Sequence, residues 1–299
     1  MFFGRKKKQK PDPRRPKGVS MENIQAPSDR IVRKVPELRV EYRRVAGNRK
    51  YQQDDLYVSA KCKKLAFNKK TRVMAVVCDG MGGMADGGRA SSTAIKMMAQ
   101  AFQKVEREPE LDIPRFFQQG IYAIDRTIAG FPKEDGKGSG TTMAACIAED
   151  NRLYWASVGD SRIYIIRGTQ IQQVTKDHNY GLRLEQMKAA GRITEEEVTA
   201  ARHKEALISF LGMGNVSLMD INTAPFEMQF GDVIMICSDG ITKTLPDAQI
   251  RKIITAEEVK LEKKAEALIT AATRMNTHSQ DNTSVVLICY REKDIRENS

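Results

Sequence analysis

The sequence predicts an α+β fold in which antiparallel sheets are covered by helices. Its strand-like segments come in hairpin groups, such as 141–147 followed by 153–158, and pairs of helical segments separate the groups. A doubly wound parallel sheet would instead alternate single strands with single helices. The chain has 299 residues, of which 41% are hydrophobic, and it is therefore long enough to bury a large core.

The elements are expected in a definite order within one folded domain, 37–292, which is followed by a short tail, 293–299. Alternating or continuous apolar patterns predict strands at 38–42, 55–59, 73–78, 141–147, 153–158, 163–166, 170–174, 233–237 and 284–290. Apolar residues at helical spacing predict helices at 87–104, 113–129 and 256–274, and a short one that begins at Leu245-Pro-Asp247.

A polar segment at about 177–215 interrupts the run of strands. It has helical patterns and no strand of its own, and Thr194-Glu-Glu-Glu197 is a capping box that opens a helix. We expect this segment to lie as a mobile flap over one face of the domain.

The formal net charge of +11 is located near the N-terminus. Residues 1–50 contain 16 Lys and Arg residues against 5 Asp and Glu residues, which leaves 33 of each in residues 51–299. The remainder is therefore neutral, and it has few aromatic residues that would stack on bases. We expect no nucleic-acid partner.

Residues 1–36 are expected to form a basic tail and linker. The first 18 residues hold eight basic residues, one acid and three prolines, a composition that favours disorder. Two interpretations stay open for them: a solvated leader, or weak contact with an anionic surface through the basic charges and Phe2 and Phe3. No apolar run approaches the roughly 20 residues of a membrane-spanning helix. The five cysteines include no CxxC pair, so we expect a reduced cytoplasmic protein, at most peripheral to a membrane through residues 1–18.

Three acids stand at the ends of three predicted strands. Asp79 follows strand 73–78 and begins a glycine-rich turn, Asp239 follows strand 233–237, and Asp281 precedes the last strand. Glycine lets a main-chain carbonyl approach a ligand closely. Carboxylate and carbonyl oxygens are the ligands that Mg²⁺ and Mn²⁺ prefer, and no His or Cys cluster suggests zinc. Two such ions about 4 Å apart would hydrolyse a phosphate ester by lowering the pKa of a bridging water.

Three residues of reactive types are interpreted as structural. Cys146 begins a spacing that matches the loop of cysteine-dependent phosphatases, but Glu149 within that spacing would repel a phosphate. His178 is expected in a surface or supporting position, with substrate contact as the less favoured alternative. Arg162 is expected to pair with Asp160 or with another acid.

Six motifs, in order, resemble those of the metal-dependent Ser/Thr protein phosphatases of the PP2C type (PPM family), in particular the compact bacterial form. They are Arg49-Lys-Tyr-Gln-Gln53-Asp54, Asp79-Gly-Met-Gly-Gly83, Gly140-Thr-Thr142, Gly159-Asp-Ser-Arg162, Ser238-Asp-Gly240 and Gln280-Asp-Asn282. The segment 177–212 also resembles the flap of that family. The resemblance covers residues 38–290 and implies a four-layer α/β/β/α sandwich, in which two antiparallel sheets are flanked by helix pairs.

The resemblance also implies a ligand set for two ions of Mn²⁺ or Mg²⁺. Asp79 would bridge both metals, and the Gly80 carbonyl would bind one of them. Asp239 and Asp281 would bind the other, and Asp54 would hold metal-bound water or complete a shell.

A third ion is typical of bacterial relatives. Here it would use Asp239 together with Glu134 or Asp135, which stand slightly before the expected position. Met81 replaces the histidine that many eukaryotic members carry, so the proton of the leaving group must come from water or from elsewhere.

The function implied is hydrolysis of phosphoserine and phosphothreonine by metal-activated water, without a phosphoenzyme. Arg49 would receive the substrate phosphate, and it would act with Asp54 and Asp79 as the catalytic set. The implied partners are phosphorylated proteins, namely a bacterial Ser/Thr kinase and its substrates, and we expect a monomer. Two alternatives remain: a metal-dependent phosphoesterase for small substrates, and a regulatory pseudophosphatase. The complete set of acids disfavours the second, because a degenerate site is expected to have lost at least one ligand.

Overall fold

The computed structural model describes residue 1 and residues 32–59, 72–82, 86–133, 138–275 and 280–296. The chain divides into two units, Val35–Lys293 and a small one made of Met1–Lys34 with Asp294–Ser299. The larger unit holds every element discussed below, apart from the outer ends of the first and last strands. The predicted tail at 2–18, Cys62, Glu134 and Asp135 lie outside the described residues.

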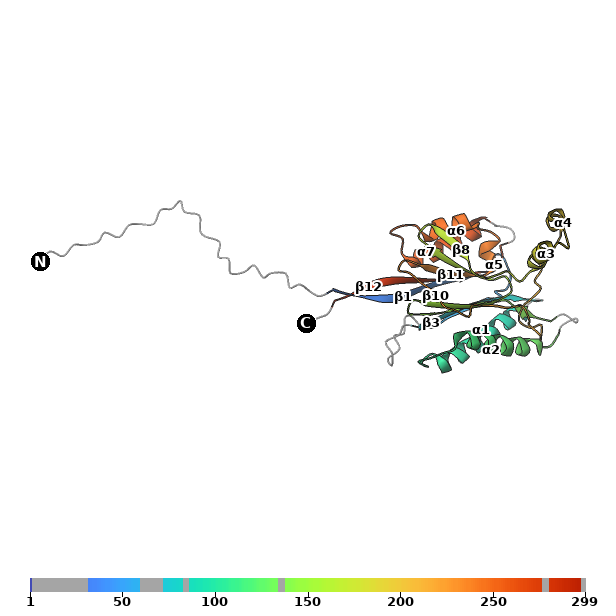
Figure 1. The fold of residues 1–299 in the computed structure, drawn as a ribbon, viewed down its shortest axis with the longest axis horizontal. Helices are drawn as coiled ribbons and strands as arrows, with labels where there is room; N and C mark the ends of the chain where they lie inside the picture. Colours follow the sequence, from blue (N-terminus) through green and yellow to red (C-terminus); the bar gives the residue numbers. More distant parts are fainter. Residues whose placement is uncertain (2–31, 60–71, 83–85, 134–137, 276–279, 297–299) are drawn as a thin grey trace. The chain divides into compact units, whose positions relative to one another are not determined.

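Two antiparallel sheets form the centre of the larger unit (Figure 1). The five-stranded sheet has the order β1 (Val32–Val45), β12 (Thr283–Arg296), β11 (Val233–Cys237), β7 (Arg162–Arg167) and β8 (Gln170–Gln173). The seven-stranded sheet has the order β10 (Phe226–Glu227), β6 (Arg152–Val158), β5 (Met143–Glu149), β3 (Arg72–Met81) and β2 (Asp54–Val58), with β4 (Gly140–Thr141) beside β3 and β9 (Asp220–Ile221) beside β6.

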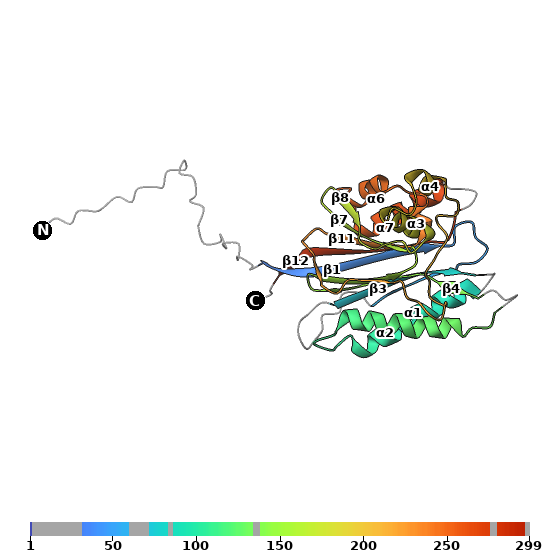
Figure 2. The same ribbon diagram turned by 45° about the vertical axis from the view of Figure 1, so that its right-hand side comes forward.

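Helices cover the outer face of each sheet, so that four layers are stacked (Figures 1 and 2). The helices α1 (Asp86–Val105) and α2 (Ile113–Ala129) lie on the seven-stranded sheet. The helices α5 (Asp239–Thr242), α6 (Asp247–Ile254) and α7 (Leu261–Met275) lie on the five-stranded sheet. The predicted four-layer fold is confirmed.

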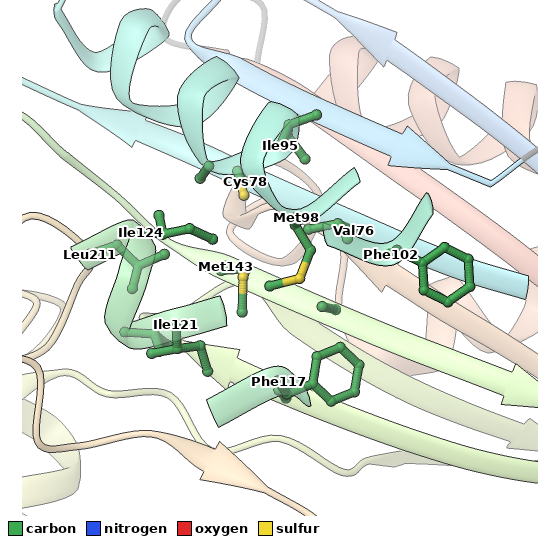
Figure 3. Close-up of a cluster of buried hydrophobic side chains, with 14 of the residues drawn as sticks. Val76, Cys78, Ile95, Met98, Phe102, Phe117, Ile121, Ile124, Met143 and Leu211 are labelled. Carbon is green, nitrogen blue, oxygen red and sulfur yellow. The ribbon is translucent and has the colours of Figure 1, made fainter. Parts of the chain in front are cut away.

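The β3 strand shows why this stacking suits the sequence. Met74, Val76 and Cys78 pack against α1 and α2, as Figure 3 shows for Val76 and Cys78, while Val73 and Val77 face the five-stranded sheet. Successive side chains of a strand point to opposite faces, so a strand between two apolar layers needs a continuous apolar run. The run at 73–78 therefore marks a strand that is buried on both sides.

The flap contains α3 (Tyr180–Ala189) and α4 (Glu195–Ala200), and the predicted capping box at the start of α4 is present. Within the described flap residues the only strand-like pairings are isolated bridges, Asn179 with Leu207 and Thr141 with Leu211. The flap thus has no sheet of its own.

Some element boundaries differ from the prediction. The first strand extends through Pro36, which an edge strand tolerates because one side of its backbone is unpaired. The helix predicted from residue 256 begins at Leu261, and Glu258 before it has φ 59°, a left-handed conformation that no α-helix can include. The short elements β9, β10 and α5 were not predicted. Among the described residues, no helix has the length and apolarity needed to cross a membrane.

Candidate active site

A pocket of about 370 Å³ lies where strand ends from both sheets meet. Four aspartates line it: Asp79, Asp160, Asp239 and Asp281. Asp79 is on β3 of the seven-stranded sheet, whereas Asp239 begins α5 directly after β11 of the five-stranded sheet. The sandwich thus brings together the acids that the sequence placed at separate strand ends.

Asp54 lies behind these acids and is buried, with 2% of its surface exposed. Its Oδ2 accepts hydrogen bonds from the hydroxyls of Ser238 and Ser284, each at 2.7 Å. Its Oδ1 is buried without a hydrogen-bond partner among the described atoms. Burial raises the pKa of Asp54 to about 7, against the two serine hydroxyls that lower it, and the charges of Asp239 and Asp281 raise it further.

Asp79 is fixed through its backbone. Its N–H donates to Thr142 Oγ1 at 2.9 Å, and its carbonyl accepts from the Thr142 N–H at 2.8 Å. Burial raises the pKa of the Asp79 carboxyl well above its ordinary value, and the charges of Asp54 and Asp239 add to this. Burial likewise raises the pKa of Asp160 to about 6. The acids of this cluster therefore cannot all be ionised together unless a cation compensates their charge.

Two protein cations face this cluster. Arg49 Nη2 donates to Asp281 Oδ2 at 2.8 Å, and the Lys243 ammonium group contacts Asp239 Oδ2. Asp239 Oδ1 is buried and has no hydrogen-bond partner within the described part of the chain. Among the described residues, no three His, Cys, Asp or Glu side chains already converge on one point as a closed ligand set.

The residues nevertheless fit divalent cations. Two buried carboxylate oxygens, Asp54 Oδ1 and Asp239 Oδ1, lack donors, and the neighbouring acids hold one another's pKa high. A buried carboxylate oxygen without a hydrogen-bond donor is costly, and metal coordination removes that cost. The donor set is made of hard oxygens, which suits Mg²⁺ or Mn²⁺.

Gly80 sits in a space that admits no side chain. A Cβ atom built on it would lie 2.1 Å from the Gly87 carbonyl oxygen and 2.7 Å from that of Gln53. Its N–H donates to the Gln53 carbonyl at 3.1 Å. The tight backbone packing expected of this glycine turn is present, and the role of the Gly80 carbonyl as a metal ligand stays a prediction.

The structure thus brings the predicted Arg49, Asp79, Gly80, Asp239 and Asp281 into one pocket, with Asp54 directly behind. Sequence reasoning missed four further lining residues: Asp160, Lys243, and Glu205 and Leu207 of the flap. Asp160 stands in the motif Gly159-Asp-Ser-Arg162, which could have revealed it. Lys243 follows Asp239 by four residues, a spacing that becomes informative only once α5 is known to be a helix.

The residues interpreted as structural occupy structural positions. Cys146 lies in the middle of β5, is fully buried, and has its pKa raised to about 12 by burial, so it is no nucleophile. Arg162 forms a two-pronged ion pair with Asp177, with Nε–Oδ1 and Nη2–Oδ2 distances of 3.0 and 2.6 Å. His178 is buried, and its Nδ1 accepts the Gly159 N–H at 3.1 Å.

Comparison with known proteins shows which family this chain resembles. The family model described as protein phosphatase 2C matches residues 48–281. Protein phosphatase PhpP of Streptococcus pneumoniae is 29% identical over 228 residues, which are 76% of this chain and 89% of that protein. The serine/threonine phosphatase stp of Listeria innocua is 29% identical over 224 residues, covering 74% of this chain and 86% of that protein.

Solved structures show the same likeness in three dimensions. The serine/threonine phosphatase of S. agalactiae superposes with a TM-score of 0.73 and 27% identity, over 84% of this chain and 99% of that one. The catalytic domain of the phosphatase PstP, in complex with 2 manganese ions, superposes with a TM-score of 0.67 and 28% identity, over 86% of this chain and 100% of that one. The chain belongs to the protein phosphatase 2C family.

Proposed function

We propose that this protein is a metal-dependent protein phosphatase that removes phosphate from phosphoserine and phosphothreonine residues. One observation carries the proposal: acids from both sheets surround one pocket with unpartnered buried oxygens, and a flexible guanidinium group stands at its edge. A site of this kind suits cations and a phosphate together, and family relatives with the printed name of Ser/Thr phosphatase support the substrate class.

The proposed metal ligands are Asp79, the Gly80 carbonyl, Asp239 and Asp281, with Asp54 in support. Two ions are proposed, in line with the two manganese ions of the PstP neighbour, and a third ion through Asp239 remains a proposal. When bound, such ions neutralise phosphoryl oxygens and lower the pKa of water.

The chain's own residues supply binding and orientation. Arg49 is 57% exposed at its side chain, so its guanidinium can leave Asp281 and hold two phosphate oxygens at once. Thr142 holds the backbone of Asp79 through two hydrogen bonds, and the Asp79 side chain lines the pocket. Met81 lines the pocket and has no proton to give, so the leaving oxygen takes its proton from water or from another group.

The flap supplies one wall of the pocket through Glu205 and Leu207. We propose that it contacts the polypeptide around the phosphorylated residue, and thereby favours protein over small substrates. A Ser/Thr kinase and its substrates are the proposed partners, and the enzyme is proposed to act as a monomer in the cytoplasm.

The test is release of phosphate from a phosphothreonine peptide with and without fresh Mn²⁺. Asp79→Asn and Asp239→Asn are expected to lower kcat by about 100-fold or more, because each removes a proposed ligand charge. Asp247→Asn, at an exposed position in the first turn of α6, is the matched control and should keep the wild-type rate. A wild type that releases no phosphate, or Asn variants at its rate, would contradict the proposal.

A second substrate distinguishes a protein phosphatase from the alternative, a phosphoesterase for small substrates. We expect a higher kcat/KM for the phosphothreonine peptide than for p-nitrophenyl phosphate, since the flap can contact only the peptide. The reverse order would favour a phosphoesterase of small molecules.

Residues 1–18 are proposed to add weak attraction to anionic surfaces. Deletion of these residues should leave peptide turnover unchanged and should reduce binding to vesicles that contain anionic lipid. Unchanged vesicle binding would indicate that residues 1–18 are a solvated leader.

A further inference from the structure

Lys243 has a position that the proposed mechanism does not use. Its backbone N–H donates to the Asp239 carbonyl at 2.8 Å, which closes one helical turn after the acid. This turn brings the Lys243 side chain back over Asp239, where its ammonium group contacts Oδ2. The lysine side chain is 52% exposed, whereas that of Asp239 is only 12% exposed.

This contact differs from an ordinary surface ion pair because of what surrounds it. Lys243 lines the acidic pocket, and the charges of Asp239, Asp160 and Asp79 all act on its ammonium group. An exposed pair on a helix contributes little, since water solvates both partners. Here the acid is largely removed from water and has other acids beside it. The lysine therefore neutralises part of a buried cluster.

We propose that Lys243 is an internal counter-cation of the acidic centre, which competes with a divalent ion for Asp239 and, once displaced, offers its ammonium group to the phosphate in the same pocket. The inference rests on the proposed function. Arg49 stands in the same relation to Asp281, so both cations among the described lining residues pair with proposed ligands.

The consequence is a coupling between two binding events. If Asp239 coordinates an ion, the Lys243 ammonium group is released from Asp239. A free ammonium group on a flexible four-carbon stem can then reach a phosphate oxygen. Metal binding should therefore strengthen phosphate binding, and by thermodynamic linkage phosphate should strengthen metal binding by the same factor. Lys243 would therefore weaken the binding of metal alone and favour the state in which metal and phosphate are bound together.

The first test measures metal affinity by titration calorimetry with Mn²⁺ alone. Lys243→Met keeps the aliphatic stem and removes the charge, and we expect it to bind Mn²⁺ roughly five- to tenfold more tightly than wild type. The matched control is Lys263→Met, which removes one charge from an exposed helical pair with Glu266 on α7, outside this pocket. It should stay within about twofold of wild type, because solvent screens exposed charges. Lys243→Arg, which keeps the charge, should also stay near wild type.

The second test measures the affinity for inorganic phosphate by calorimetry, with and without Mg²⁺. Wild type should bind phosphate more tightly with Mg²⁺, and Lys243→Met should lose roughly five- to tenfold of that affinity. If Lys243→Met binds Mn²⁺ no more tightly than wild type, the competition is wrong. If its Mn²⁺ affinity rises while phosphate affinity in Mg²⁺ is unchanged, the role at phosphate is wrong.

These outcomes are distinct from failure of the proposed function. A wild type that binds Mn²⁺ but does not hydrolyse the phosphothreonine peptide would contradict the function, and the calorimetric difference for Lys243→Met would still support the competition. Active wild type together with identical Mn²⁺ affinities for all variants would contradict only the role of Lys243.

Discussion

Asp54 and Asp79 stand opposite each other in the antiparallel ladder between β2 and β3. Like charges at directly opposed positions destabilise a strand pair. The two acids are also shielded from water, which makes their repulsion stronger than on a surface. The ladder therefore holds an arrangement that costs stability by itself and gains from a cation.

The first prediction concerns stability without metal. Asp79→Asn removes one of the opposed charges at nearly constant shape, so its melting temperature in EDTA should equal or exceed that of wild type. Saturating Mn²⁺, at about 100 times its Kd, should stabilise wild type by about 2.7 kcal/mol and should leave the variant nearly unchanged. Thermal unfolding in EDTA and in Mn²⁺ measures both values. A variant that melts well below wild type in EDTA would show that the acid stabilises the fold.

The second prediction concerns the tight turn. Gly80→Ala should destabilise the protein by about 3 kcal/mol or more, because the added methyl group meets backbone atoms that cannot move aside. Gly130→Ala is the control: this glycine has φ −79° after α2, and its added Cβ would meet nothing closer than 3.5 Å. It should change the free energy of unfolding by less than about 0.5 kcal/mol. Urea unfolding compares the two, and equal costs would contradict the steric argument.

The third prediction concerns the end of the flap. The buried Asp125 carboxylate on α2 accepts the backbone N–H groups of Gly212, Gly214 and Val216, at 2.8, 3.1 and 3.0 Å. Asp125→Ala leaves these donors without their acceptor and should cost about 2–4 kcal/mol.

Hydrogen exchange localises this effect. Asp125→Ala should increase exchange at 212–216 more than elsewhere in the domain. Asp112→Ala, which removes only the N-cap bond to Arg115 at 3.1 Å, should cost about 1 kcal/mol and leave exchange at 212–216 unchanged. Equal exchange in the two variants would show that α2 does not anchor the flap.

The fourth prediction concerns acid stability. Burial lowers the pKa of His178 below its usual 6.5, against the charges of Asp220 and Asp177, which raise it, while Lys176 lowers it. The folded state then binds this proton less readily than the unfolded state. The stabilising contribution of neutral His178 is therefore complete above pH 6.5 and is lost as the pH falls below it.

A variant isolates this contribution. His178→Asn retains an oxygen that can accept the Gly159 N–H and has no proton to gain. Its stability deficit relative to wild type should shrink between pH 8 and pH 5.5, by up to about 1 kcal/mol. Urea unfolding at the two pH values measures the difference, and a constant deficit would contradict it.

The sequence predicted those features that depend on local pattern. The runs at 73–78 and 233–237 are buried on both faces, so their apolar residues are continuous and their ends are visible. The acids at these ends were found because a charge directly after such a run stands out. Motif resemblance then supplied the order of the layers.

The remaining features depend on contacts between distant segments. The strands β9 and β10 have two residues each and exist because they pair with the edge of β6. Lys243 joins the pocket only because one short helical turn folds it back over Asp239. Asp160 was considered only as a partner for Arg162, which in fact pairs with Asp177. Pairing and turning of this kind leave no periodic trace in a sequence.

The hydrogen bond from Ser284 to Asp54 joins residues that are 230 positions apart in the chain. During synthesis β2 and β3 are made long before β12, whereas a domain generally folds as a unit. Ser238 can donate to Asp54 earlier, but the second donor, Ser284, is in place only when the last strand has been made and paired. A nascent chain that stops before residue 284 contains the four aspartates that line the pocket, yet it lacks β12, which lies between β1 and β11 in the five-stranded sheet. The last segment to be made thus completes both the five-stranded sheet and the hydrogen bonds behind the acidic pocket.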